Sequence, residues 1–305
     1  MKKILISDTH FGVRQNSMTW LKSQEDFVYK QLIPFIKSQD EEITLVHLGD
    51  VFDSRSSVST YVAARVIKIF EELKSIVSEV IVVAGNHDFY SPNSDEIDTN
   101  TLLLKQTGIT IVSDHVMVRG EDLYVPWYEW FDQAALQETI NKNGTKFVFT
   151  HADLLAEVHI SGPRIFSGHI HTPKIDGRKF TLGSTYALTF ADANQERGFY
   201  VLTDDEIKFH PNNISIKFWK FNDIPDQEVS CGDYINLYIE RVKLDNVEYL
   251  ARVKEWVKDK RNCQLYPVET THSGGGIECE EYNINDICEE MIPDHLKEKF
   301  KLICE

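Results

Sequence analysis

The pattern of hydrophobic and polar residues in the first 170 positions repeats: a short apolar run, such as Ile43 to Val46, ends abruptly in a polar loop. Apolar residues at helical spacing lie between these runs, most clearly from Thr60 to Val77. Short apolar runs that alternate with amphipathic helices predict βαβ units and a buried parallel sheet. We therefore expect strands at 3–7, 43–48 and 80–84, with helices at 24–37 and 60–77.

The pattern changes beyond residue 108, where short alternating segments follow one another with little helical spacing between them. This arrangement predicts a second group of strands, and the two groups together indicate a two-layered β-core flanked by helices. Residues 89–100 are rich in turn formers, so we expect a surface excursion there. The remaining expected elements are strands at 110–112, 115–118, 123–125, 146–150, 164–167, 180–182, 198–203 and 206–209, and a helix at 132–141.

A domain boundary is expected after Phe221, where the sequence reads Asn-Asp-Ile-Pro-Asp. A strand, a helix and a strand are predicted between 233 and 269, and a glycine-rich stretch at 271–276 indicates a flexible linker or hairpin tip. Two short amphipathic helices divided by Pro293 end the chain. We divide the chain into 1–222, 223–276 and 277–305.

Composition limits the functions that this chain can have. Its 305 residues are enough for one large core and a small appended domain. A formal net charge of −16 argues against binding nucleic acid by global electrostatics, so such a substrate would need metal ions, local cations or a partner. The five cysteines all follow residue 230 without a C-x-x-C pair, which is typical of reduced thiols in the cytoplasm. No apolar run approaches the roughly 20 residues of a membrane span, so we expect a soluble protein.

Oxygen and imidazole donors follow five of the predicted strands. The set contains no thiolate, so it favours Mn²⁺, Fe or Zn²⁺ over a structural cysteine site. It also exceeds what one tetrahedral ion binds, so we interpret it as two ions bridged by Asp50 and about 3.5 to 4 Å apart. A single histidine after a strand is ordinarily structural, but five matched strand ends argue against coincidence. Asp8, His10 and His171 are expected to bind one ion, and Asn86, His151 and His169 the other.

Five motifs resemble, in their order, the signature of calcineurin-like metallophosphoesterases over roughly the first 220 residues. The resemblance implies a four-layer α/β/β/α sandwich with the ligand assignment given above. It also implies Mn²⁺ as the usual metal among the nucleases of this group, with Mg²⁺ as another possibility. The motifs are Asp8-Thr9-His10, Gly49-Asp50-Val51-Phe52-Asp53, Gly85-Asn86-His87-Asp88, His151 and Gly168-His169-Ile170-His171.

His87 is left over once the metal ligands are assigned, and it is adjacent to Asn86. It is our candidate general acid, which would protonate the leaving oxygen of a phosphoester. In the phosphatases of the family the carboxylate matching Asp53 pairs with this histidine, which would orient the ring and favour its charged form. The alternative is that Asp53 caps a turn. The archaeal and eukaryotic nucleases of the group usually have histidine at this position, so their two-histidine scheme does not carry over.

Within the superfamily the chain is most similar to SbcD-type nucleases and, in its compact length, to the recombination endonuclease subunits of T-even-like phages. This similarity is supported by three motifs, Gly-Asp-Val-Phe-Asp, Gly-Asn-His-Asp and Glu196-Arg197-Gly198-Phe199. The resemblance implies a DNA nuclease that cuts double-stranded ends and single strands, and that acts as a homodimer with two copies of an SbcC-like coiled-coil ATPase. The alternatives are a small-molecule phosphodiesterase or phosphatase and a non-catalytic scaffold. A scaffold should have lost ligands, and all seven are present.

Three cations follow the metal motifs closely and are candidate contacts to a polyanionic substrate, although each is equally explained as a solvated surface charge. They are Arg14, Arg55 and Lys174. The unit at 223–276 resembles the capping domain that these nucleases place beside DNA, and the last helices resemble a segment that binds the ATPase. The helices could equally pack on their own chain. The helix at 60–77 resembles the family's dimer helix, but burial against the sheet explains its apolar residues too.

Overall fold

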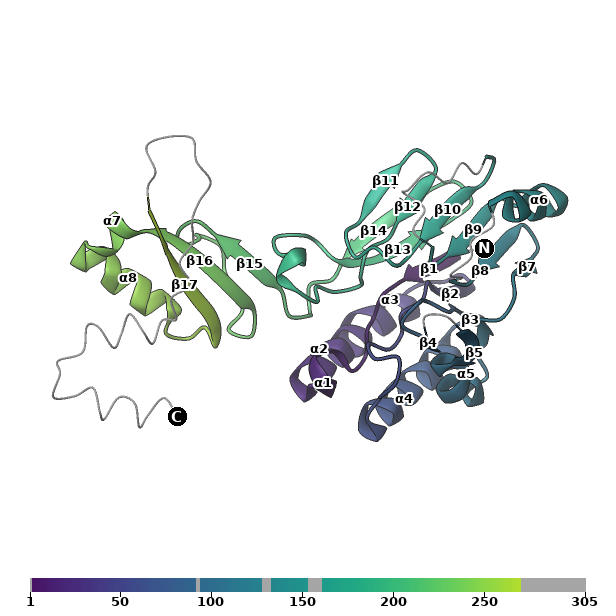
Figure 1. Ribbon diagram of the computed structural model, residues 1–305, viewed down its shortest axis with the longest axis horizontal. Helices are drawn as coiled ribbons and strands as arrows, with labels where there is room; N and C mark the ends of the chain where they lie inside the picture. Colours follow the sequence, from purple (N-terminus) through teal and green to yellow (C-terminus); the bar gives the residue numbers. More distant parts are fainter. Residues whose placement is uncertain (1, 92–93, 128–132, 153–160, 270–305) are drawn as a thin grey trace. The chain divides into compact units, whose positions relative to one another are not determined.

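The computed structural model describes residues 2–91, 94–127, 133–152 and 161–269 (Figure 1). The expected linker at 271–276 and the helices of 277–305 lie outside these residues. The contacts divide the chain into two units, which we describe separately. The first comprises residues 1–188 and 195–215, and the second comprises residues 189–194 and everything from 216 onward.

The first sheet of the large unit has six strands in the order β14-β13-β1-β2-β3-β6. Its centre is parallel, as predicted, and β13 and β14 add an antiparallel edge. The strands that lie at the centre are almost entirely buried, because helices cover one face and a second sheet covers the other. The bounds are β1 Lys2–Ile6, β2 Ile43–His47, β3 Glu79–Val83, β6 Thr110–Val112, β13 Gly198–Leu202 and β14 Ile207–Pro211.

Helices connect the parallel strands of this sheet. Between β1 and β2 the chain forms α1 (Val13–Asn16), α2 (Met18–Phe27), a π turn (Val28–Leu32) and α3 (Ile33–Lys37), and α4 (Thr60–Ile76) connects β2 to β3. Pro34, which interrupts the helical pattern in the sequence, lies in the first turn of α3. The π turn directly precedes α3 and Leu32 and Ile33 are helical, so the helix continues through this point although Pro34 lacks the N–H that a helix interior uses.

The second sheet has the order β11-β12-β10-β9-β8-β7 and α6 (Gln133–Asn143) packs beside it. Side chains of both sheets form a shared core, including Leu5, Val46 and Ile81 from the first sheet and Phe149 and Phe166 from the second. Separate cores lie between the first sheet and α2 to α4, and between the second sheet and α6. The four-layer α/β/β/α sandwich is therefore confirmed (Figure 1). The bounds are β7 Met117–Arg119, β8 Asp122–Val125, β9 Phe147–Thr150, β10 Arg164–Ser167, β11 Lys174–Asp176 and β12 Lys179–Thr181.

The segment expected to be a surface excursion has more structure than its composition indicates. β4 (Phe89–Ser91) and β5 (Ser94–Asp98) pair antiparallel and lead into α5 (Thr99–Leu104). Phe89 is buried, and the Asp98 carboxylate accepts hydrogen bonds from the first backbone N–H groups of α5. The pairing of β4 with β5 was not predicted because the segment is rich in turn-forming residues. Strand partners are set by register, which composition does not report.

The second unit contains a parallel sheet in the order β15-β16-β17 (β15 Phe218–Phe221, β16 Tyr234–Glu240, β17 Asn262–Val268). The short helix α7 (Arg241–Leu244) and α8 (Val247–Val257) connect β16 to β17, so the predicted strand, helix and strand are present. β15 begins before the boundary expected at 222, because it pairs with β16, and the contacts divide the chain at 215. The capping role of this unit stays a prediction. None of the described helices has the length and apolarity of a membrane span.

Candidate metal centre

The predicted ligands all lie in loops that follow the carboxyl ends of strands in the two sheets. Asp8 and His10 follow β1, Asp50 follows β2 and Asn86 follows β3, whereas His151, His169 and His171 follow β9 and β10. Parallel strands bring such loops to one edge of a sheet, and the packing of the two sheets brings the two edges together. A continuous series of contacts joins the seven side chains.

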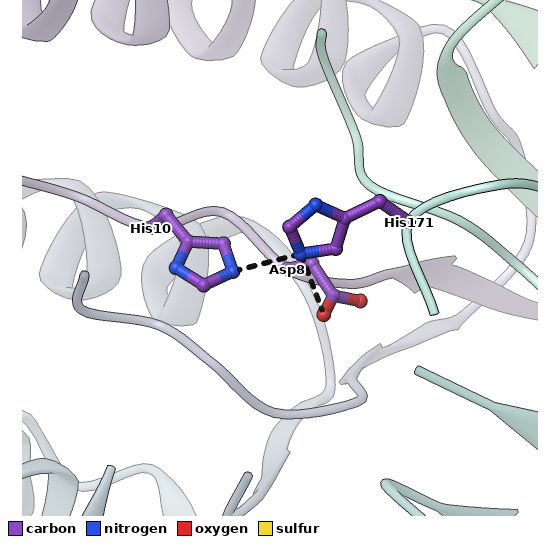
Figure 2. A group of neighbouring side chains, drawn as sticks. All are labelled: Asp8, His10 and His171. Atoms are coloured by element: carbon purple, nitrogen blue, oxygen red, sulfur yellow. Dashed lines mark hydrogen bonds and ion pairs between the residues drawn. The ribbon is translucent and has the colours of Figure 1, made fainter. Parts of the chain in front are cut away.

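The first group consists of Asp8, His10 and His171, whose donor atoms all lie within 4.8 Å of one another. Nε2 of His10 and Nε2 of His171 are 3.2 Å apart, and Asp8 Oδ1 is 3.8 Å from Nε2 of His171. Figure 2 shows the two rings and the carboxylate pointing toward one another. Two imidazole nitrogens and a carboxylate that converge in this way are a typical ligand set for a divalent ion.

The second group consists of Asn86, His151 and His169. The amide oxygen Oδ1 of Asn86 lies 3.1 Å from Nε2 of His151 and 2.8 Å from Nδ1 of His169. His151 is completely buried, and its other ring nitrogen contacts the carbonyl oxygen of Leu48 at 2.5 Å. That contact directs Nε2 toward the centre, as an outer hydrogen bond does for a metal-binding histidine.

The Asp50 carboxylate lies between the two groups. Its Oδ2 is 3.6 Å from Nε2 of His10, and its Oδ1 is 3.3 Å from Nε2 of His151. Each oxygen therefore faces a different group, which is the position of a carboxylate that bridges two ions. Asp8 also approaches the second side, because its carboxylate shares a cluster with Asp50 and His151. The seven residues thus fit a centre of two divalent ions, and their assignment as ligands stays a prediction.

The backbone of four of these residues has an unusual conformation. Asp8, His10, Asp50 and His169 have φ angles of 50°, 41°, 55° and 74°, in the left-handed region that non-glycine residues rarely adopt. Each such residue costs on the order of 1 kcal/mol or more, so the surrounding structure has to hold it in place. The amide of Gln24 contributes to this, because it donates hydrogen bonds to the carbonyl oxygens of Thr9 and His10 at 2.9 and 3.2 Å.

Asp88 holds the second and third loops together, a role that sequence reasoning did not assign. Its carboxylate accepts hydrogen bonds from the backbone N–H groups of Asp50 (2.9 Å), Val51 (3.0 Å) and Gly85 (2.8 Å). Complete burial, together with the charges of Asp50 and Asp98, raises the pKa of Asp88 to about 7. The only signal in the sequence was its place directly after Gly85-Asn86-His87.

Two glycines let the loops approach closely. A Cβ atom on Gly49 would collide with the ring of His151, and one on Gly85 would collide with the carboxylate and backbone N of Asp50. Gly49 also has a φ of +88°, which disfavours any side chain there. The two glycines are therefore required by the close packing of the Asp50 loop against its neighbours.

The charges of the centre act on one another strongly. Burial alone would lower the pKa of His151, but the charges of Asp50 and Asp8 and the hydrogen bonds of the ring together outweigh it and raise this pKa to about 9. Burial also opposes a charge on His10, and Asp53, Asp50 and Asp8 together raise its pKa. For Asp50, burial is outweighed by the neighbouring histidines, which hold its pKa far below the ordinary value. The carboxylates thus create a negative potential that attracts cations.

His87 and Asp53 lie beside the centre, but the pairing implied by the family resemblance is absent. Nδ1 of His87 contacts the backbone carbonyl oxygen of Asp53 at 2.6 Å, whereas the Asp53 carboxylate faces Nδ1 of His10 at 3.4 Å. The prediction that the carboxylate itself pairs with His87 is therefore corrected. The loop conformation after Phe52 decides this, because it presents the carbonyl to one histidine and the side chain to the other. The catalytic roles of both residues stay predictions.

The three candidate substrate cations have different environments. The guanidinium of Arg14 lies 4.9 Å over the ring of Trp20. Arg55 is half-buried, and its Nη1 has no hydrogen-bond partner in the described parts of the chain. Lys174 is exposed at the start of β11. Their role in binding a substrate stays a prediction.

Two known proteins have sequences similar to this chain. Exonuclease subunit 1 of Enterobacteria phage T4 is 24% identical over 235 residues, which is 70% of this chain and 69% of that protein. The DNA double-strand break repair protein Mre11 of Saccharolobus solfataricus is 32% identical over 83 residues, which is 27% of this chain and about a fifth (21%) of that protein.

Two solved structures and one protein family are also similar to this chain. Pseudomonas putida nuclease MPE has a TM-score of 0.33 at 18% identity, over 55% of this chain and 61% of that one. Phosphopantetheinyl hydrolase of Mycobacterium tuberculosis has a TM-score of 0.32 at 13% identity, over 60% of this chain and 89% of that one. The model of the calcineurin-like phosphoesterases matches residues 1–195, across all seven predicted ligands. The chain therefore belongs to the calcineurin-like phosphoesterase family and is a metal-dependent phosphoesterase.

Proposed function

We propose that this protein is the Mn²⁺-dependent nuclease subunit of a DNA recombination or repair complex, which hydrolyses phosphodiesters at double-stranded ends and in single strands. The observation that carries the proposal is the position of Asp50, whose two oxygens face two separate groups of donors. The choice of DNA as substrate rests on the similarity to exonuclease subunit 1 of phage T4 and to part of Mre11.

In this proposal Asp8, His10 and His171 would hold one ion, Asn86, His151 and His169 would hold the other, and Asp50 would serve both. When bound, two divalent ions supply positive charge that activates water and stabilises the charge that develops on the phosphoryl oxygens. Carboxylate and amide oxygens with imidazoles, and no thiolate, suit Mn²⁺, Fe or Zn²⁺. We propose Mn²⁺ because it is the usual metal of the nucleases that the sequence resembles, and Mg²⁺ is a further candidate.

His87 is proposed as the general acid. Its Nδ1 contacts the backbone carbonyl oxygen of Asp53 at 2.6 Å, which orients the ring. The backbone N–H of His87 donates to Oδ1 of Asp50 at 2.8 Å, which holds the loop. Nε2 then remains to hold a proton for the departing oxygen. The ring stands edge-on to His10, with ring centroids 4.9 Å apart, which places it directly beside the metal centre.

The partners are part of the proposal. We propose that the protein acts as a homodimer with two copies of an SbcC-like ATPase in the cytoplasm. A relative named as a subunit of an exonuclease supports action within an assembly of several subunits. The second unit is proposed to cap the DNA site, and the segment 277–305 to bind the ATPase. Deletion of residues 284–305 should abolish co-purification with an SbcC-like ATPase and leave Mn²⁺-dependent nuclease activity intact; retained co-purification would contradict the assignment.

The substrate is tested with the purified full-length protein on end-labelled duplex and single-stranded DNA, with Mn²⁺ or Mg²⁺, with and without the ATPase and ATP. A panel of nitrophenyl phosphodiesters and phosphomonoesters is assayed in parallel. We expect DNA cleavage in Mn²⁺ that is lost in the Asp50→Ala variant. Cleavage of the small esters without cleavage of DNA would instead support a small-molecule phosphodiesterase. Absence of both activities in the metal-loaded protein would support a scaffold.

A further inference from the structure

The ring of His10 has two nitrogens in different surroundings. Nε2 faces the centre, 3.2 Å from Nε2 of His171 and 3.6 Å from Oδ2 of Asp50. Nδ1 points the other way, is buried, and has no conventional hydrogen bond in the described parts of the chain. A ring that binds a cation through Nε2 carries its proton on Nδ1, and a buried N–H without an acceptor is costly. His10 therefore needs an acceptor on its outer side.

The Asp53 carboxylate is in the position to be that acceptor. Its Oδ1 lies 3.4 Å from Nδ1 of His10, so a small rotation brings the two atoms to hydrogen-bond distance. The carboxylate does not face His87, which uses the backbone carbonyl of Asp53 instead. A histidine with a carboxylate on one nitrogen and a ligand position on the other is oriented and made more basic by the carboxylate.

The two sides of the centre differ in how this outer contact is made. On the second side, Nδ1 of His151 contacts the carbonyl oxygen of Leu48, which belongs to the backbone and is insensitive to side-chain replacement. On the first side the outer contact of His10 comes from a side chain that is 35% exposed. Loss of this side chain should therefore affect one side of the centre and leave the other intact.

We propose that Asp53 is a positioning residue for His10, and that through His10 it sets the affinity of the Asp8–His10–His171 group for its divalent cation. The inference rests on the proposed two-ion centre but not on DNA as the substrate. It differs from a catalytic pair of Asp53 with His87, because that pair predicts changed turnover with unchanged metal binding. The proposal predicts that metal binding itself changes, at one site of two.

The test is a Mn²⁺ titration of the metal-free, full-length protein by calorimetry, with electron paramagnetic resonance to distinguish coupled ion pairs from single ions. The wild type should bind two ions and show the coupled signal. In Asp53→Ala one ion should bind within about twofold of the wild-type affinity. The other should bind ~10- to 100-fold more weakly, with the coupled signal replaced by that of single ions. Asp53→Asn, which keeps an acceptor but loses the charge, should fall between the two.

His87→Asn is the matched control, because it removes the alternative partner of Asp53 and should leave both affinities unchanged. Thermal unfolding in EDTA establishes that the variants are folded. The proposal would be overturned if Asp53→Ala bound both Mn²⁺ ions with wild-type affinity. It would also be overturned if the variant bound both ions more weakly by the same factor. A wild-type protein that binds fewer than two ions would overturn the two-ion centre itself. No step of this test uses DNA, so failure of the DNA cleavage assay would leave its result unaffected.

Discussion

The two sides of the metal centre use similar donors, and each has one half-buried histidine, His169 on one side and His171 on the other. They differ in how the fully buried histidine is held. The ring of His151 is packed against Gly49 and Gly85, and its outer nitrogen contacts a backbone carbonyl. The ring of His10 instead faces the Asp53 carboxylate, which belongs to a side chain that is 35% exposed. The comparison teaches that similar ligands can be supported by the backbone on one side and by a replaceable side chain on the other. We call the His151 side the enclosed side and expect it to bind its ion more tightly.

Asp50→Ala should weaken metal binding on both sides of the centre and have the largest effect of the substitutions considered. Removing the carboxylate between the groups takes a ligand from each proposed ion, so bound Mn²⁺ should fall from two ions to fewer than one. Phosphodiester hydrolysis should fall on the order of a thousandfold or more, because each ion contributes several kcal/mol to the transition state. Metal analysis after gel filtration and initial rates measure both. Asp176→Ala, in an exposed position on β11, is the control. Two retained ions would rule out the bridging role.

His87→Ala should leave both sides filled and still reduce turnover. A general acid contributes roughly 10²- to 10⁴-fold, so hydrolysis of esters with poor leaving groups should decrease by that factor. Nitrophenyl esters, whose leaving group needs less protonation, should be affected less. Steady-state rates on both substrates, with metal content measured in parallel, test this. An equal decrease on both substrates, or loss of metal, would remove His87 from this role.

Gly85→Ala should disturb the Asp50 carboxylate from the enclosed side. The added Cβ would collide with the carboxylate and backbone N of Asp50, and crowding of this kind costs about 1–3 kcal/mol. We expect a lower free energy of unfolding in urea and weaker binding of Mn²⁺. Gly232→Ala is the matched control, because the nearest atom there is 4.0 Å from an added Cβ. Equal stabilities of the two variants would show that the loop adapts and that the enclosed side is not rigid.

His47, which contacts the loop after β1, should make the free energy of unfolding depend on pH. Its Nε2 lies 2.9 Å from Oγ1 of Thr9, the residue that separates Asp8 from His10 in the sequence. Burial lowers the pKa of His47 to about 3. The unfolded chain therefore binds a proton at a higher pH than the folded chain does. Stability from this group is full above the unfolded pKa of about 6.5 and is lost as the pH falls toward 3.

Between pH 7 and pH 5 this loss amounts to about 2 kcal/mol in the metal-free protein. His47→Gln retains a polar group toward Thr9 and lacks the titration, so its free energy of unfolding should decrease less over the same range. Urea unfolding at both pH values in EDTA gives the difference between variant and wild type, which separates His47 from His151, whose raised pKa acts in the opposite direction. Identical pH dependence of the two proteins would contradict this prediction.

Much of the centre could be predicted from the sequence, because local patterns carry the information. Apolar runs determine where buried strands end, and parallel strands bring their carboxyl ends to one edge. The seven predicted ligands therefore lie together, and their division between two ions stays a prediction. The four layers follow from the same alternation of strands and helices.

Features that depend on loop conformation were not available from the sequence. One example is the direction of the Asp53 side chain. Others are the hydrogen bonds that Asp88 accepts from three backbone N–H groups and the left-handed φ angles of Asp8 and His10. The pairing of β4 with β5 is another. Periodicity reports which residues are buried, but it carries no information on which buried group faces which. The residue types of the metal centre were determined by the sequence, whereas the contacts that orient them were decided by tertiary packing.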